Sequence, residues 1–317
     1  MTAILPGTLL PTTVVGSYPV VQGTGLRSLL SPMRYAVQEA VSDQIAAGID
    51  IISDGQVRGD MIEVFARALP GIRDRRVVSR VMPAAKPITA PDTAYARSRH
   101  RFVKGILTGP TTLAHALQIA TPAYRDRADL ALDLAQALAV EAKGLQEAGI
   151  TLLQIDEPIF STGTADLEAG KRAIEVMASV VQVPLCLHVC GTLADIIDDL
   201  LRMPVAVLDF EFSGTAYNLE VLSRKELGEK SIGFGCIDSS DPAVEKVSVV
   251  KKRIQAGLEV LDPDQLLIDP DCGLRMLSRD AAFGKLKAMV EATREVRVEF
   301  PAPTSPAGSS KAPGPWR

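Results

Sequence analysis

The chain alternates between short apolar runs and longer segments in which apolar and polar residues recur at helical spacing. The short runs are rich in β-branched residues and end in glycine or polar residues, which is typical of buried strands. The longer segments include residues 33–48 and 127–149, the second of which ends at Gly149. Eight strands are predicted in this way, over residues 12–19, 49–55, 102–110, 150–158, 183–191, 205–214, 231–238 and 265–273.

Strand–helix alternation indicates parallel strands joined by right-handed crossovers. Eight such units predict an α/β fold, a single (β/α)8 TIM barrel that occupies residues 1–300. An open doubly wound sheet is the competing architecture, and no G-x-G-x-x-G turn in the sequence supports it.

Two segments interrupt the alternation. Residues 72–101 are basic and contain several prolines, which predicts a hairpin-like excursion between the second and third strands. Residues 301–317 are rich in Pro, Gly, Ser and Ala, which predicts a disordered tail.

Composition and charge narrow the classes of function. The net charge of −4 is small and no Lys/Arg run stands out, so no nucleic-acid partner is expected. No apolar run approaches the roughly 20 residues that cross a bilayer, and the first residues lack the features of a signal peptide. We therefore expect a cytoplasmic protein with no membrane partner. Its four cysteines, Cys186, Cys190, Cys236 and Cys272, are then better explained by thiol chemistry or metal binding than by disulfides.

Nearly every predicted strand ends in polar residues or glycine. In a barrel enzyme the carboxyl ends of the strands converge on one rim, where the active site lies. One polar strand end is ordinary loop chemistry, whereas eight at one rim predict a site. The residues concerned are Gly16, Ser17, Asp54, Gln56, Thr108, Asp156, Glu157, His188, Cys190, Asp209, Glu211, Asp238 and residues 269–272.

The stretch LCLHVCGT at residues 185–192 suggests a metal site. It places Cys186, His188 and Cys190 at every second position of a strand, so the three side chains share one face. Zinc takes about four ligands from thiolate, imidazole and carboxylate groups. His188 and Cys190 alone are a weak signal, but Glu211 and Cys272 end other strands and complete a predicted set of four. The other two cysteines are expected to pack in the core.

Six motifs, in order along the chain, point to a known family: TTVVGSYP, VKGILTGPTT, LLQIDEP, HVCG, DFEFSG and DPDCGL. Over about residues 12–298 the chain resembles the catalytic C-terminal barrel of cobalamin-independent methionine synthase, in the short core form that lacks the second, N-terminal barrel. The resemblance implies that zinc is bound by His188, Cys190, Glu211 and Cys272.

The same resemblance implies a homocysteine site. Gly16 and Ser17 fall on family elements that bind homocysteine, and the carboxylate of Asp156 in QIDEP would hold the substrate ammonium, with Glu157 beside it. Asp156 and Glu211 are the residues expected to act in catalysis.

One substrate-binding position departs from the family pattern. A carboxylate that the family uses near the second strand aligns with Gln56 in this chain. Asp54 and Asp60 are the nearby carboxylates that could take its place.

Two further departures concern the methyl donor. Folate-using members have a tryptophan after the GPTT-like motif, which stacks on the pterin, where this chain has about Ala116. They also have a histidine after the seventh strand, associated with protonating the departing folate, where Ser240 stands. A cobalt(I) leaving group needs neither a proton nor a pterin-stacking residue. We therefore predict methylcobalamin or a methylated corrinoid protein as the donor, rather than methyltetrahydrofolate.

The predicted function is zinc-dependent methyl transfer to homocysteine, which gives methionine. A competing hypothesis is alkyl transfer to coenzyme M or another thiol, for which an extra Arg or Lys is expected to bind the sulfonate. Asp156 argues for a substrate with an ammonium group instead. Two more hypotheses stay open at this point: a methionine synthase that uses folate, and a non-catalytic partner of a corrinoid protein in which zinc is only structural.

Overall fold

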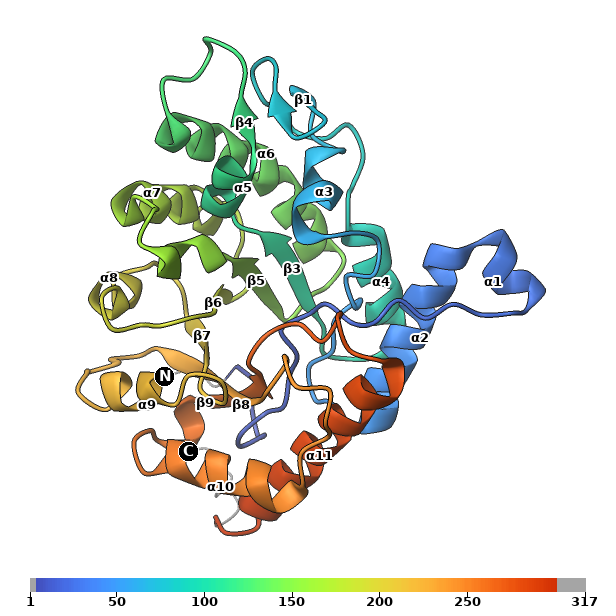
Figure 1. The fold of residues 1–317 in the computed structure, drawn as a ribbon, viewed down its shortest axis with the longest axis vertical. Helices are drawn as coiled ribbons and strands as arrows, with labels where there is room; N and C mark the ends of the chain where they lie inside the picture. Colours follow the sequence, from blue (N-terminus) through green and yellow to red (C-terminus); the bar gives the residue numbers. More distant parts are fainter. Residues whose placement is uncertain (1–3, 301–317) are drawn as a thin grey trace, which may run out of the picture.

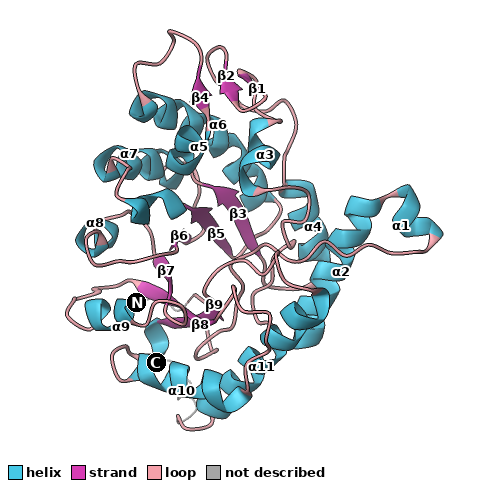
Figure 2. Ribbon diagram, in the orientation of Figure 1, coloured by secondary structure: helices cyan, strands magenta, loops and turns pink. Residues whose placement is uncertain are grey.

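A parallel sheet of six strands lies at the centre of the molecule, with neighbours in the order β3-β5-β6-β7-β8-β9, and helices surround it (Figures 1 and 2). The computed structural model describes residues 4–300, so the predicted tail at 301–317 lies outside the described residues. Nearly all residues of these strands are buried, as expected for a parallel sheet covered by helices. The strands are β3 (Lys104–Thr108), β5 (Leu152–Asp156), β6 (Leu185–Val189), β7 (Val207–Glu211), β8 (Ser231–Ile237) and β9 (Leu266–Pro270).

The first two predicted strands join this sheet through single bridges. Thr12 pairs with Ile268 of β9, and Ile52 pairs with Val103 immediately before β3, both in parallel orientation. The Ile51 amide donates to the Thr12 carbonyl at 2.9 Å, so hydrogen bonds run round a closed ring of eight segments. The predicted α/β fold with a parallel sheet is confirmed, and its first two strands are shorter than expected.

The helices lie on the outside of the ring. The helices predicted over residues 33–48 and 127–149 correspond to α2 and α6. At the right of Figure 1, α1 and the start of α2 project from the rest of the molecule. Among residues 4–300, no helix combines the length and the apolar character needed to span a bilayer. The helices are α1 (Leu26–Leu30), α2 (Pro32–Ala47), α3 (Met61–Ala66), α4 (Ala90–Arg99), α5 (Pro110–Ala116), α6 (Arg127–Glu147), α7 (Leu167–Ala178), α8 (Ile197–Leu201), α9 (Tyr217–Leu222), α10 (Val247–Leu258) and α11 (Arg279–Arg297), with 3-10 turns η1 (Pro158–Thr162) and η2 (Pro263–Gln265).

The excursion between the second and third segments begins with a hairpin, as predicted. Its strands β1 (Ile72–Arg73) and β2 (Arg76–Val77) are antiparallel and are joined through Asp74 and Arg75, both with positive φ. β2 also pairs in parallel with β4 (Gln118–Ile119), and α4 occupies the end of the excursion.

The inside of the ring changes from apolar to polar along the strands. An apolar cluster of inward-facing residues includes Leu152, Cys186, Val207 and Leu267, so Cys186 is a core residue as predicted. Cys236 of β8 is also fully buried in the main core. Two residues further along these four strands, the inward side chains are buried polar groups: Gln154, His188, Asp209 and Asp269. The polar end of the ring therefore faces the loops that follow the strands.

Candidate metal and substrate site

Three of the four predicted metal ligands lie together. His188 belongs to β6, Cys190 follows its end, and Cys272 follows β9. One ligand atom from each lies within 4.8 Å of the others. His188 is buried, whereas the two cysteines are partly exposed, so the cluster can be reached from outside.

The surroundings of His188 suit a metal ligand. Both ring nitrogens are buried, and neither makes a hydrogen bond of good geometry among the described residues. Nδ1 lies 3.2 Å from an Asp209 carboxylate oxygen, which leaves Nε2 available to a metal. A carboxylate behind the imidazole is the usual support of a histidine that binds a metal. Burial opposes the charged form of His188, but the Asp209 carboxylate outweighs it and raises the pKa of His188 well above its usual value.

The two thiols interact directly. The interaction between them lowers the pKa of Cys190 and raises the pKa of Cys272, so Cys190 is the thiol that ionises more readily. Two neighbouring thiols, one of them with a lowered pKa, suit a thiophilic divalent ion such as zinc, which displaces the thiol protons when it binds.

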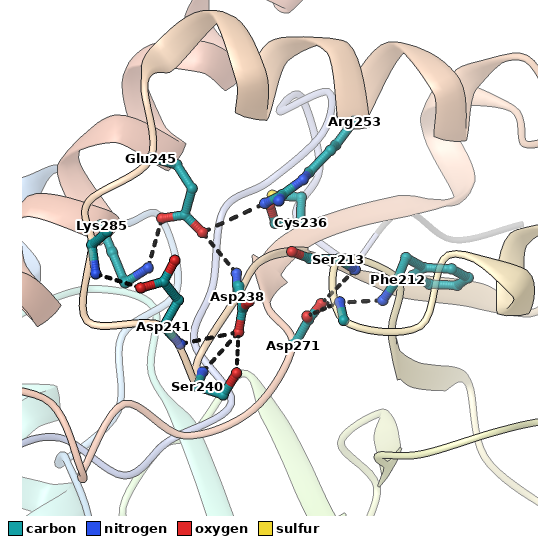
Figure 3. Close-up of polar contacts among 12 residues, drawn as sticks. Phe212, Ser213, Cys236, Asp238, Ser240, Asp241, Glu245, Arg253, Asp271 and Lys285 are labelled. Carbon is teal, nitrogen blue, oxygen red and sulfur yellow. Dashed lines mark hydrogen bonds and ion pairs between the residues drawn. The ribbon is translucent and has the colours of Figure 1, made fainter.

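Glu211, the fourth predicted ligand, lies at the end of β7 outside the three-residue cluster that the described residues form. Its carboxylate accepts a hydrogen bond from the Thr215 hydroxyl, and its charge acts on Cys190. Asp271 holds the loop that follows Glu211. Its carboxylate accepts hydrogen bonds from the backbone amides of Phe212, Ser213 and Gly214 at 2.6–3.1 Å (Figure 3). The residue before Cys272 therefore ties its loop to the loop that follows Glu211.

A cavity of about 400 Å³ opens from this cluster. Its inner part is lined by the three clustered residues together with Ser17 and Asp156. Its outer wall is formed by the loop after the second segment, by α3 and by the loop after Cys272, and it is mainly apolar. The apolar residues of this outer wall are Val57, Met61, Val64, Phe65 and Met276, and the charged residues Arg58, Asp60 and Arg275 line it as well.

Asp156 is buried at the end of β5 and lines the cavity. Burial raises the pKa of Asp156 to about 6, opposed by the nearby His188 and by a hydrogen bond from Gln154. Its carboxylate is thus ionised at neutral pH and can pair with a cation that enters the cavity.

Gly16 and Ser17 are placed by close packing. Gly16 has φ +150°, and an added Cβ would collide with Ile106 and lie 2.8 Å from the Gln56 amide oxygen. A Cβ on Gly273 would collide with the Ser17 hydroxyl. Ser17 lines the cavity, whereas Gly16 supports the wall from behind.

Gln56 lines the cavity in a left-handed conformation, with φ +44°. Its amide donates to Asp54 at 2.8 Å, and its carbonyl accepts from Arg275 at 2.9 Å. Asp54 is therefore occupied in supporting Gln56. Asp60 caps the amino end of α3 and pairs with Arg75 on the hairpin.

Three comparisons with known proteins bear on this arrangement. The family model described as "Cobalamin-independent synthase, Catalytic domain" matches residues 10–295. A methionine synthase from Methanothermobacter marburgensis is 44% identical over 308 residues, which cover 90% of this chain and 99% of that protein. One from Methanocaldococcus jannaschii is 41% identical over 312 residues, 90% of this chain and 99% of that protein. The solved B12-independent methionine synthase from Shewanella sp. W3-18-1, in complex with selenomethionine, has a TM-score of 0.80 at 25% identity, with coverage of 92% and 99%.

The chain belongs to the cobalamin-independent methionine synthase family. The resemblance predicted from the six motifs is confirmed, and so is the predicted class of enzyme, because the archaeal relatives are methionine synthases along nearly their full length.

Glu157, which is predicted to bind substrate beside Asp156, lies behind the wall of the cavity. It is fully buried and is not among the residues that line the cavity. Its carboxylate accepts from the Thr111 and Thr112 amides at 2.8 and 2.7 Å and from the Thr112 hydroxyl. Burial raises its pKa to about 7 against these hydrogen bonds. Glu157 therefore caps the amino end of α5, and its role in binding substrate stays a prediction.

Ser240, which stands where folate-using members of the family have a histidine, takes part in a loop network (Figure 3). Its amide and hydroxyl both donate to Asp238, at 2.8 and 2.6 Å. The Asp238 amide in turn donates to Glu245, which accepts from the buried Lys285. The loop after β8 is thus held by its own polar groups.

Several residues of this site were missed by the sequence analysis. Lys104 and Gln154 face the inside of the ring, and Arg58 and Arg275 line the cavity. A lysine within the apolar run FVKGILT was the available signal for Lys104, since a charge inside a buried strand requires partners. The two arginines lie in loops, where charged residues are too common to single out.

Proposed function

We propose that the protein is a zinc-dependent methyltransferase that makes methionine from homocysteine, with methylcobalamin or a methylated corrinoid protein as methyl donor. The observation that carries this proposal is the cluster of His188, Cys190 and Cys272 at the inner end of a cavity that Ser17 and Asp156 also line. The family relationship and the names of the archaeal relatives support the same reaction.

The residues present fit zinc. They offer one buried imidazole nitrogen that makes no hydrogen bond of good geometry among residues 4–300, and two adjacent thiols, of which Cys190 has a lowered pKa. Glu211, whose carboxylate now holds Thr215, is the proposed fourth ligand and the exchangeable one. Zinc bound there would lower the pKa of a substrate thiol while leaving its sulfur nucleophilic.

The protein's own residues orient the amino acid. Asp156, ionised at neutral pH and buried, is the proposed partner of the homocysteine ammonium. Ser17, packed against Gly273, fixes the wall beside it. Holding the amino-acid end in this way sets the direction of the thiol toward the donor, which is a positional contribution to rate.

The proposed donor follows from what the outer cavity offers. A cavity of about 400 Å³ has the size of sites that bind drug-sized ligands, so an amino acid does not fill it. The transfer forms a sulfur–carbon bond and breaks a cobalt–carbon bond, and the electron pair stays on cobalt(I). No proton is required by this leaving group, in agreement with Ser240 in place of a histidine.

A direct test is to assay the purified protein with each donor. We expect about one zinc per chain and methionine formation from homocysteine with methylcobalamin. Efficient turnover with methyltetrahydrofolate and no corrinoid would contradict the proposed donor. This assay does not test three other proposals, which are the (β/α)8 barrel, the cytoplasmic location and the absence of a nucleic-acid partner.

The ligand set is tested by Cys272→Ser. We expect this variant to lose most of its bound zinc and its activity, because a serine hydroxyl is a poor zinc ligand. Cys186→Ala is the matched control: it also removes a thiol, but from the apolar cluster inside the ring, and should keep its zinc. Full zinc content in the Cys272→Ser protein would show that the ligand set is wrong.

A second candidate, transfer to coenzyme M, is favoured by one observation. Arg275 lines the cavity and forms no salt bridge among the described residues, although its charge acts on Asp60, so its guanidinium can pair with an anion such as a sulfonate. Competition between homocysteine and coenzyme M for the methyl group separates the two. Preference for coenzyme M would replace the proposed substrate.

A further inference from the structure

A lysine lies completely buried inside the ring, beneath the proposed metal and substrate site. Lys104 is 1% exposed, and its ammonium donates to the Val14 carbonyl at 2.8 Å and to the Gln154 amide oxygen at 2.7 Å. It also lies 4.0 Å from an Asp209 carboxylate oxygen. Burying a cation is costly unless it is paired, so this position needs a reason beyond packing.

Lys104 is connected to the metal cluster through the carboxylate of Asp209. Asp209, itself 0% exposed, places one carboxylate oxygen toward Lys104 and the other 3.2 Å from Nδ1 of His188. The equally buried Asp269 interacts with both Lys104 and Asp209. On the neighbouring strand, a Cβ added to Gly233 would lie 2.8 Å from the Asp209 carboxyl carbon, so the glycine makes room for this carboxylate.

Lys104 is also connected, through Gln154, to Asp156, the proposed partner of the substrate ammonium. Because an ammonium group can only donate, it fixes the oxygen of the Gln154 side chain on its own side. The Gln154 amide nitrogen must then point the opposite way, where it donates to Asp156 at 2.7 Å and to the Val15 carbonyl at 2.6 Å. Lys104 therefore determines which atom Gln154 presents to Asp156.

We propose that Lys104 is a positioning residue for both halves of the site: through Asp209 it orients His188, and through Gln154 it orients Asp156. This inference rests on the proposed function for the identity of the ligands. It assigns one buried charge the task of fixing the spacing between the sulfur-binding end and the ammonium-binding end of the cavity.

The two connections can be separated by substitution. Asp209→Asn interrupts the path to His188 and should weaken zinc binding about 10–100-fold, while homocysteine binding to the zinc-saturated protein changes little. Gln154→Met interrupts the path to Asp156 and should weaken homocysteine binding roughly tenfold with zinc affinity unchanged, because a hydrogen bond to a charged group is lost. Lys104→Met should weaken both.

The chain offers a matched control. Lys285 is also fully buried, and its ammonium donates to Glu245 at 2.8 Å, outside the ring (Figure 3). Lys285→Met removes a buried cation from a paired carboxylate, as Lys104→Met does, but away from the site. We expect it to reduce stability and to leave the affinities for zinc and homocysteine at their wild-type values.

The experiment measures zinc affinity by competition with a chelator and homocysteine binding by calorimetry, on the full-length protein loaded with zinc. If folded Lys104→Met keeps both affinities, as Lys285→Met is expected to, Lys104 is merely structural and the proposal is overturned. If Lys104→Met does not fold, Asp209→Asn and Gln154→Met test the proposal instead. It is overturned if either of these two variants changes both the zinc affinity and the homocysteine affinity, or changes neither. If the wild-type protein binds zinc but no homocysteine, the proposed function is contradicted. The zinc affinities of the variants then test only whether Lys104 orients His188 through Asp209.

Discussion

At the scale of single residues, burial decides what each carboxyl group does. Asp156, Glu157 and Asp54 all lie near the cavity and all have pKa values raised by burial. Their hydrogen-bond partners give them different roles. Asp156 lines the cavity, Glu157 accepts hydrogen bonds from the amino end of α5, and Asp54 accepts one from the backbone amide of Gln56. The sequence shows three acidic residues at strand ends and cannot tell these roles apart.

Asp54 makes a pH-dependent contribution to stability. Burial raises its pKa from 3.8 to about 6, so between these values the folded protein retains a proton that the unfolded chain has released. The stabilisation is complete below pH 4 and is lost as the pH rises through about 6, by up to about 3 kcal/mol.

Asp54→Asn is the corresponding variant, because an amide can still accept from the Gln56 amide and donate to the Thr93 hydroxyl. We expect the variant to gain stability relative to wild type as the pH rises from about 4 to about 8. Urea unfolding at a series of pH values measures the difference. A difference that stays constant across this range would show that Asp54 is not buried as described.

At the scale of elements, the amino end of α5 is held by the carboxylate of Glu157, which lies next to it in space. Gly109 precedes this helix, and a Cβ added there would collide with the carboxyl group of Glu157. The carboxylate can reach the Thr111 and Thr112 amides only because position 109 has no side chain.

Gly109→Ala should therefore destabilise the protein by roughly 1–3 kcal/mol, through overpacking and displacement of the helix cap. The control is Gly25→Ala, where an added Cβ meets nothing within 4 Å. Its effect should stay within about 0.5 kcal/mol. Equal unfolding midpoints in urea for the two variants would rule out the capping role of Glu157.

The periodic pattern predicted the elements where apolar residues dominate. Residues 102–110 and 183–191 contain β3 and β6, and residues 33–48 almost coincide with α2. The first two segments form only single bridges because the chain turns away at Gly16 and at Gly55, both with positive φ. The helices α3 and α4 were not predicted: α3 has only six residues, and the amino end of α4 is capped by Glu141, which is distant in sequence.

At the scale of the whole molecule, ring closure brings the site together. His188 and Cys272 are far apart in sequence, but His188 lies near the end of β6 and Cys272 follows β9 in the same parallel sheet, so both lie at its carboxyl edge. The sequence could predict this convergence because parallel strands share one direction. It could not predict that Lys104 links Asp209 to Gln154, because that depends on the packing of side chains across the ring. The contact of Glu211 with Thr215, four residues further on, depends on the conformation of the loop after β7.

The most direct test of the account is X-ray absorption at the zinc edge, with and without homocysteine. Without substrate, we predict two sulfur neighbours, from Cys190 and Cys272, together with nitrogen and oxygen neighbours. Adding homocysteine should add a third sulfur at the expense of an oxygen. A zinc environment with no cysteine sulfur, or one that homocysteine leaves unchanged, would contradict the claim that this cluster binds the substrate thiol.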